Sequence, residues 1–205
     1  TPNLSEALCA DGTFYATANR SLTTVNAIPG TTTYTYDVPV MTGGMTGGVA
    51  RTTGSELAIT DTYFNNTNSV QTATYSVIPT AANGCTGDAV DVVITVNPRP
   101  LINSATTGTV CSNYAYSYSI TSNVSGSTYT WERAVVPGIS NSAGSGTTST
   151  ISETLINTTG VPVLVTYVLT PSANGCEGTS SDLVVTVNPT PAVTVGLTEA
   201  ICSGE

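Results

Sequence analysis

The chain has 205 residues, a length that fits one or two domains; 8% of them are charged and 40% are hydrophobic. Its formal net charge of −9 argues against binding to nucleic acid phosphates. Lysine and histidine are absent, which removes the commonest general base, the commonest metal ligand and Schiff-base chemistry. The cations are all arginines: Arg20, Arg51, Arg99 and Arg133.

One stretch of the sequence occurs twice. Residues 83–100 (NGCTGDAVDVVITVNPRP) and 174–191 (NGCEGTSSDLVVTVNPTP) align at an offset of 91 (176 − 85), with 11 of 18 positions identical. Self-similarity at a fixed period is the signature of a repeat protein. We therefore expect repeat 1 at residues 1–98, repeat 2 at residues 99–189, and the truncated start of a third repeat at residues 190–205.

Each repeat opens with a segment in which large and small side chains alternate. In repeat 2 this segment places Tyr114, Tyr116, Tyr118 and Ile120 on one face, which predicts a half-buried strand. The three tyrosines cannot all be buried without partners for their hydroxyl groups, so we expect one or two of them at the surface.

The following segments match between the repeats. Residues 33–38 (TYTYDV) and 128–132 (TYTWE) place Tyr36 and Trp131 at equivalent positions, where we expect one large aromatic in each core. Residues 57–64 match 149–156, residues 72–79 match 163–171, and each repeat ends with a strand before Asn-Pro. About seven short strands with turn signals between them indicate an antiparallel β-sandwich. Only residues 3–10 have a loosely helical spacing.

The repeats are joined by an Asn-Pro-x-Pro segment. Proline fixes its own φ and favours an extended conformation for the residue before it, so such a hinge is short and stiff. We expect the modules to lie end to end as a rod. The hinge residues are Pro98, Pro100, Pro189 and Pro191.

Four motifs, CSxx, YTW, ANGCxG and VTVNPxP, carry a family resemblance. With them the chain resembles the PKD-like and immunoglobulin-like repeats of very large Bacteroidota surface proteins, including gliding-motility adhesins exported by the type IX secretion system. The resemblance implies tandem all-β, immunoglobulin-like (PKD-like) sandwiches arranged end to end. Repeat 1 departs from the pattern, since Ala-Asp-Gly follows Cys9 and Tyr36 replaces the tryptophan.

Five cysteines at repeated positions, without any CxxC or CxxH pair, indicate a disulfide framework and not a zinc site. We expect Cys9 to pair with Cys85 and Cys111 with Cys176, so that each bond closes one repeat. Such a bond contributes about 4 kcal/mol in the chain-entropy description. Cys202, 91 residues after Cys111 (202 − 111), is then left unpaired in this window.

Ligand signals are weak. Asp88, Asp91 and Asp182 suggest interdomain calcium, but no EF-hand loop is present, so we expect no cofactor and keep calcium as the alternative. Asp61-Thr62 is similar to the core of the O-glycosylation motif of Bacteroidota. Candidate N-glycosylation triplets begin at Asn3, Asn19, Asn65, Asn123 and Asn157.

The leading hypothesis is a non-catalytic structural or adhesive module, the stalk of an extracellular surface protein. The expected partners are further repeats of the same polypeptide and a surface polysaccharide or host ligand, without nucleic acid or membrane insertion. One alternative is a carbohydrate-binding or spacer module of a secreted enzyme, which a cluster of exposed aromatics would favour. Another is the subunit of a polymeric filament.

Overall fold

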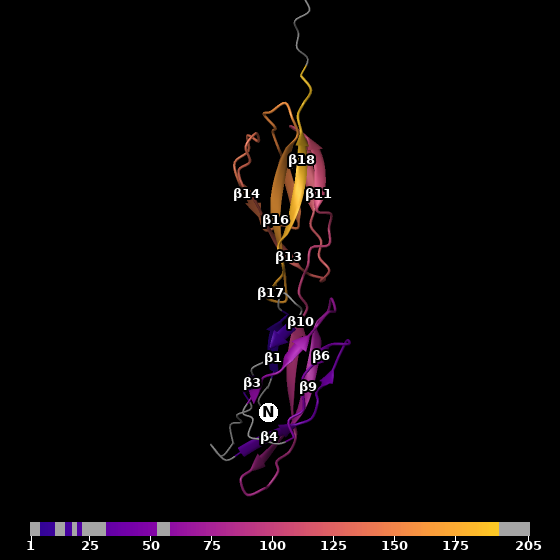
Figure 1. Ribbon diagram of the computed structural model, residues 1–205, viewed down its shortest axis with the longest axis vertical. Coiled ribbons are helices and arrows are strands. Elements are labelled where there is room, and N and C mark those ends of the chain that lie inside the picture. Colours follow the sequence, from indigo (N-terminus) through magenta and orange to yellow (C-terminus); the bar gives the residue numbers. More distant parts are fainter. Residues whose placement is uncertain (1–4, 11–14, 18–19, 22–31, 53–57, 193–205) are drawn as a thin grey trace, which may run out of the picture.

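The computed structural model describes residues 5–10, 15–17, 20–21, 32–52 and 58–192. Every regular element in these ranges is a β-strand. The strands form two β-sandwiches that are stacked end to end along the longest axis of the molecule (Figure 1). Within the described ranges, no helix has the length and apolar character needed to cross a membrane.

Repeat 1 is built on one long sheet and two smaller ones. The long sheet has the order β1 (Ser5–Cys9), β10 (Val90–Asn97), β9 (Gln71–Ala81) and β4 (Thr32–Tyr36), and β5 (Val40–Met41) also pairs with β9. The smaller sheets are β2 (Tyr15–Thr17), β8 (Thr62–Phe64) and β6 (Thr46–Gly47), and the pair β3 (Arg20–Ser21) and β7 (Ala58–Ile59).

Repeat 2 has the same arrangement with fewer pieces. Its long sheet has the order β11 (Thr107–Cys111), β18 (Ser181–Asn188), β16 (Val163–Ala173), β13 (Thr128–Arg133) and β14 (Gly144–Gly146). The short β17 (Cys176–Glu177) folds back on β16. The opposite sheet consists of β12 (Ala115–Ser119) and β15 (Thr150–Thr154).

The first strand of each repeat runs parallel to the last. Cys9 at the end of β1 lies opposite Asn97 at the end of β10, and Cys111 lies opposite Asn188 in the same way. All other strand pairs are antiparallel. The predicted antiparallel β-sandwiches are confirmed, with one parallel strand pair at the edge of each long sheet. Residues 5–9, within the loosely helical patch, form strand β1.

Each repeat has its own hydrophobic core. Tyr36 and Trp131 are both buried and occupy equivalent registers, two residues after a tyrosine that pairs with a proline of the long strand. Tyr36 packs edge-on against Tyr75, with ring centroids 5.1 Å apart, and Trp131 packs edge-on against Tyr167 at 5.9 Å. The two cores are thus built around the same aromatic pair.

The tyrosines that open repeat 2 separate as predicted. Tyr114 is 66% exposed, and Tyr116 is buried. Tyr118 is half-buried, and its hydroxyl donates to Ala105 O at 2.5 Å and lies 2.7 Å from Ser104 Oγ. A buried ring with a hydrogen-bonded hydroxyl is the stable form of such a residue.

Candidate functional site: the junction between the repeats

A disulfide bond joins the two repeats. Cys9 ends β1 of repeat 1, and Cys176 begins β17 of repeat 2 directly after the β16–β17 turn, with 5.4 Å between their Cα atoms. Figure 1 shows why they meet: β1 ends at the upper end of repeat 1, and the β17 hairpin reaches down from repeat 2 to the same level. The bond spans 167 positions of sequence.

The predicted pairing within each repeat is wrong. Cys9 was expected to bond Cys85, but β1 runs parallel to β10, so Cys9 lies at the far end of β10 from the turn that holds Cys85. The eight residues of β10 alone span about 25 Å, whereas the Cα atoms of a disulfide lie about 6 Å apart. The same geometry separates Cys111 from Cys176 along β18.

Polar contacts accompany the disulfide. The side-chain amide of Asn97 donates to the carbonyl of Asn174, 3.4 Å away in the Asn-Gly-Cys turn of repeat 2. Asn123 connects three segments: its Oδ1 accepts from the backbone N–H of Leu101 at 2.7 Å, and its Nδ2 donates to Oδ1 of Asn68 in repeat 1 at 2.8 Å. These contacts tie the turn and the hinge of repeat 2 to the end of repeat 1.

The hinge between the repeats is packed against the same turn. Pro98 and Pro100 are both buried, and Leu101 forms a parallel bridge with Thr179. Gly178 lies so close to the carbonyl of Pro100 that a side chain at this position would overlap it. The second glycine of the NGCxG motif therefore permits the close approach of hinge and turn.

In two of the Asn-x-Thr triplets the asparagine amide donates hydrogen bonds to backbone carbonyls of neighbouring segments, an arrangement that we call a clasp. The Asn65 side chain is fully buried; its amide donates to the carbonyls of Ser69 and Val96, and its oxygen accepts from Thr67. Asn157 makes the equivalent bonds in repeat 2, including one to the carbonyl of Val187. Because these amide groups are used inside the fold, neither asparagine is available for glycosylation.

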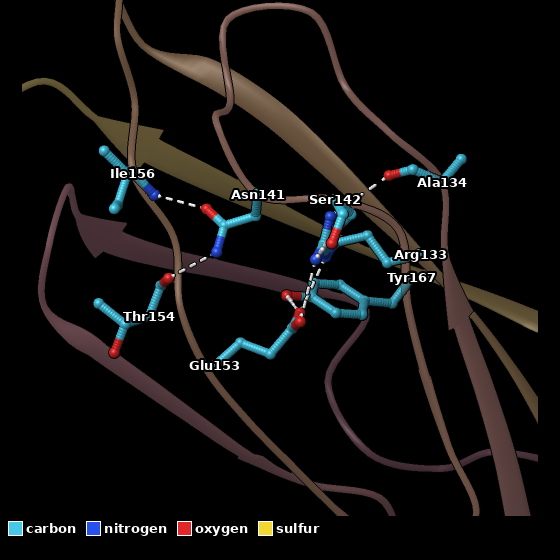
Figure 2. A network of polar contacts seen from close by, with 8 residues as sticks. All are labelled: Arg133, Ala134, Asn141, Ser142, Glu153, Thr154, Ile156 and Tyr167. Carbon is cyan, nitrogen blue, oxygen red and sulfur yellow. Dashed lines mark hydrogen bonds and ion pairs between the residues drawn. The ribbon is translucent and has the colours of Figure 1, made fainter.

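Figure 2 shows a cluster of ionisable side chains in repeat 2, which makes it a candidate for acid–base chemistry. The Arg133 guanidinium donates two parallel hydrogen bonds to the Glu153 carboxylate, at 2.9 and 3.0 Å, and one to the carbonyl of Ser142 at 2.8 Å. Tyr167 donates to the same carboxylate at 2.6 Å. The Arg133 side chain is 1% exposed and that of Glu153 is 18% exposed.

The protonation states of this cluster follow from its contacts. The hydrogen bond from Arg133 lowers the pKa of Glu153, although burial opposes it. The same bond raises the pKa of Arg133, and burial together with the bond to Glu153 raises the pKa of Tyr167. A carboxylate that accepts three donors inside the fold is a structural ion pair, not a free acid or base.

Repeat 1 has a counterpart of this cluster, in which Asp61 lies at the position of Glu153 and Tyr75 at that of Tyr167. Asp61 accepts from the Tyr75 hydroxyl at 2.5 Å and from the backbone N–H of Val49 at 3.1 Å, and the Tyr63 hydroxyl lies 2.7 Å from that of Tyr75. Burial raises the pKa of Tyr75, and its hydrogen bond to Asp61 adds to the effect. Asp61, the acidic residue of the candidate O-glycosylation motif Asp61-Thr62, is therefore buried in the interior of repeat 1.

The predicted calcium ligands lie apart. Asp91 and Asp182 are exposed on the last strands of different repeats, and Asp88 is exposed in the turn before β10. In the described ranges no three Asp, Glu, Cys or His side chains come together as a metal site. Calcium binding stays a prediction. Cys202, Asn3 and Asn19 lie outside the described residues.

Among the cysteines that the structure describes, two are thiols. Cys85 is exposed in the turn before β10, and Cys111 is exposed at the end of β11. The sequence does contain a signal for pairing between repeats. The second cysteine of one repeat lies 26 residues before the first cysteine of the next, both for Cys85 and Cys111 (111 − 85) and for Cys176 and Cys202 (202 − 176).

The comparison with known families places both repeats in one class. The PKD-like domain matches residues 6–100 and again residues 108–191, which together include the disulfide, the hinge and both cores. A search among curated protein sequences found no match.

The chain is also similar to several solved structures at low sequence identity. The chain is similar to immunoglobulin domains 1 and 2 of DIP-gamma, with 10% identity, 93% of this chain and 94% of that chain covered, and a TM-score of 0.36. It is also similar to extracellular domains 3–5 of Drosophila OTK, with 12% identity, 93% of this chain and 61% of that chain covered, and a TM-score of 0.40. A third similar structure contains fibronectin(III)-like modules of Clostridium thermocellum CbhA, with 9% identity, 92% of this chain and 92% of that chain covered, and a TM-score of 0.31.

Proposed function

Because this chain belongs to the PKD-like domain family, a family of generally non-catalytic modules, we propose that it is a load-bearing segment of an extracellular stalk. In this proposal the stalk belongs to a cell-surface adhesin, of the gliding-motility type found in Bacteroidota, and is exported by type IX secretion. Its partners are further repeats of the same polypeptide, with a surface polysaccharide or a host ligand bound elsewhere on the adhesin.

The observation that carries this proposal is the disulfide between Cys9 and Cys176. A covalent bond across the junction prevents the two modules from separating under load, which a spacer of independent domains would not need. Disulfides persist in oxidising compartments, so the bond also supports an extracellular location.

The bond changes the path that tension takes through the chain. When the two ends are pulled, force passes from Cys9 directly to Cys176 and bypasses the residues between them. Only the eight residues before Cys9 and the 29 after Cys176 (205 − 176) can then be drawn out. This limits extension to about 130 Å, against about 720 Å for the whole chain without the bond.

The carbohydrate-binding alternative would be favoured by a cluster of exposed aromatic side chains. Among the large hydrophobic side chains that the structure describes as exposed, the aromatic one is Tyr114. A sugar platform uses several exposed aromatic faces together, and Tyr114 stands alone in the described part of the chain.

The direct test is to stretch single molecules from their two ends under oxidising conditions and again after reduction. We expect total extensions of about 130 Å and about 720 Å respectively. The variant Cys9→Ser should give the longer value under both conditions. An oxidised wild-type chain that extends to the full 720 Å would contradict the proposed load path.

A further inference from the structure

The two free cysteines occupy the same places in their repeats as the two bonded ones. Cys111 lies opposite Asn188 as Cys9 lies opposite Asn97. The residue after each cysteine also repeats the contact: the N–H of Ala10 donates to Asn97, and that of Ser112 donates to Asn188. Cys111 is therefore presented at the outer end of repeat 2 as Cys9 is at the junction.

Cys85 corresponds in the same way to Cys176. Both follow an Asn-Gly turn whose glycine has a positive φ, 81° at Gly84 and 76° at Gly175. The glycine two residues after each cysteine donates its N–H to a proline carbonyl of the preceding long strand, Gly87 to Pro79 and Gly178 to Pro171. Repeat 1 thus carries, at its far end, the same turn that repeat 2 inserts into the junction.

The burial of the hinges gives an independent indication. At the junction Pro98 and Pro100 are buried, and so is Asn97, which donates to the incoming turn. At the outer end of repeat 2 the equivalent Pro189 is half-buried and Pro191 is exposed. The outer end therefore presents the apolar hinge surface that the turn of a neighbouring repeat covers at the junction.

We propose that Cys111 and Cys85 are further rungs of a disulfide ladder, in which the first cysteine of each repeat bonds to the Asn-Gly-Cys turn of the next. Cys111 forms a disulfide with the turn cysteine of a following PKD-like repeat, and Cys85 forms one with the first cysteine of a preceding repeat. This inference rests on the proposed function, because it names the partner of the stalk segment at both of its ends.

The bond forms by thiol–disulfide exchange with a small-molecule disulfide such as oxidised glutathione. The Cys111 thiolate attacks one glutathione sulfur, which forms a mixed disulfide and releases one glutathione thiolate. The turn cysteine of the neighbouring repeat then attacks the sulfur of Cys111 and releases the second glutathione. Two protein thiols lose two electrons and two protons, and the glutathione disulfide gains them.

A ladder of this kind would make an array nearly inextensible. In such an array a continuous covalent path enters from a preceding repeat through the disulfide at Cys85. It then follows the backbone from Cys85 to Cys111 and leaves to the following repeat through the disulfide at Cys111. Only 26 residue steps (111 − 85) of backbone then lie in that path, and they already include strands β10 and β11 with the hinge between them. Fully extended, 26 residues measure about 90 Å.

The test is a chain with one added repeat. Residues 1–189 are followed by a second copy of residues 99–205, so that the added Arg99-Pro100 follows Asn188-Pro189 in the register of the natural hinge. Both the added Cys111 and Cys202 are replaced by serine. The added copy also carries Glu177→Gln, an exposed position, so that the peptides of its Cys176 differ in mass from the original ones.

After refolding in a glutathione buffer, peptide mapping should show Cys9 bonded to the original Cys176 and Cys111 bonded to the added Cys176, with Cys85 as the one thiol. Replacing the remaining Cys111 by serine should leave the added Cys176 as a second thiol. If Cys111 stays reduced, or is bonded to the original Cys176, the ladder is wrong.

Solution scattering on the same three-repeat chain tests the stalk separately from the disulfide ladder. A particle about three modules long with Cys111 reduced would overturn the ladder and leave the stalk intact. A compact particle would overturn the stalk itself.

Discussion

Cys9 and Cys176 are bonded to each other across the boundary between two repeats, although a cysteine of its own repeat was available to each in the sequence. The parallel pairing of β1 with β10 causes this, because it carries Cys9 to the end of the sandwich that meets the next module. The bond therefore fixes the position of one module on another, and in the described part of the chain the buried core of each module contains no disulfide.

Replacing Gly178 by alanine should disturb the junction. The added methyl group would overlap the carbonyl of Pro100 and lie 2.8 Å from the Pro171 ring, so hinge and turn must move apart. We expect a smaller fraction of molecules with the Cys9–Cys176 bond after refolding, measured by alkylation of free thiols. Gly87→Ala is the matched control, since its methyl group would meet only Pro79 and should leave the bonded fraction unchanged.

Asn65→Ala should destabilise repeat 1 by about 2 kcal/mol, because the buried carbonyl of Val96 loses its donor. The neighbouring Asn66→Ala is the control, since Asn66 is exposed and should change stability by less than about 0.5 kcal/mol. Chemical denaturation followed by circular dichroism measures both. Equal stabilities of the two variants would contradict the clasp.

Repeat 2 should lose stability in acid through Glu153. Its pKa in the folded state lies below the ordinary value of 4.5, so the stabilisation is present above pH 4.5 and is lost as the pH falls through the folded pKa. Fluorescence of Trp131, the single tryptophan and a residue of repeat 2, reports this unfolding.

The variant Glu153→Gln should remove that acid-dependent step and cost about 3 kcal/mol at neutral pH, because Arg133 stays buried without its carboxylate. Glu132→Gln, on the exposed face of the same strand as Arg133, is the control and should retain the wild-type pH profile. An unchanged profile in Glu153→Gln would show that the ion pair does not cause the acid sensitivity.

Repeat 1 should lose stability in alkali through Tyr75. Its folded pKa is raised above the ordinary 10.0 by burial and by its bond to Asp61, so the folded state keeps a proton that the unfolded state releases. Stability is therefore full below pH 10 and falls as the pH rises further. Ultraviolet absorbance of tyrosinate, recorded during unfolding, should show Tyr75 ionising only when repeat 1 unfolds; Tyr75→Phe should lose this signal and the exposed Tyr114→Phe should retain it.

Much of the architecture could be predicted from particular residues. The 91-residue period of the NGCxG segment indicates two similar modules, and the matching registers of Tyr36 and Trp131 are visible in the TYTY and TYTW segments. The need of buried tyrosine hydroxyls for partners also predicts that one or two of Tyr114, Tyr116 and Tyr118 lie at the surface, as Tyr114 does. These features are local, since strand periodicity and side-chain size decide them.

The disulfide pairing could not be derived in the same way. Strand alternation does not tell whether β1 runs parallel or antiparallel to β10, and that choice decides which end of the module carries Cys9. The roles of Asn65 and Asn157 were missed for a similar reason. An Asn-x-Thr triplet has the same sequence whether its amide is exposed or bonded to a distant strand.

The most direct measurement is a map of the disulfides in the intact 205-residue chain, obtained by proteolysis without reduction and mass spectrometry. A peptide pair that joins Cys9 to Cys176, with Cys85 and Cys111 recovered as thiols or as mixed disulfides, is the result expected here. Peptide pairs that join Cys9 to Cys85 and Cys111 to Cys176 would contradict the covalent junction, the load path and the ladder together.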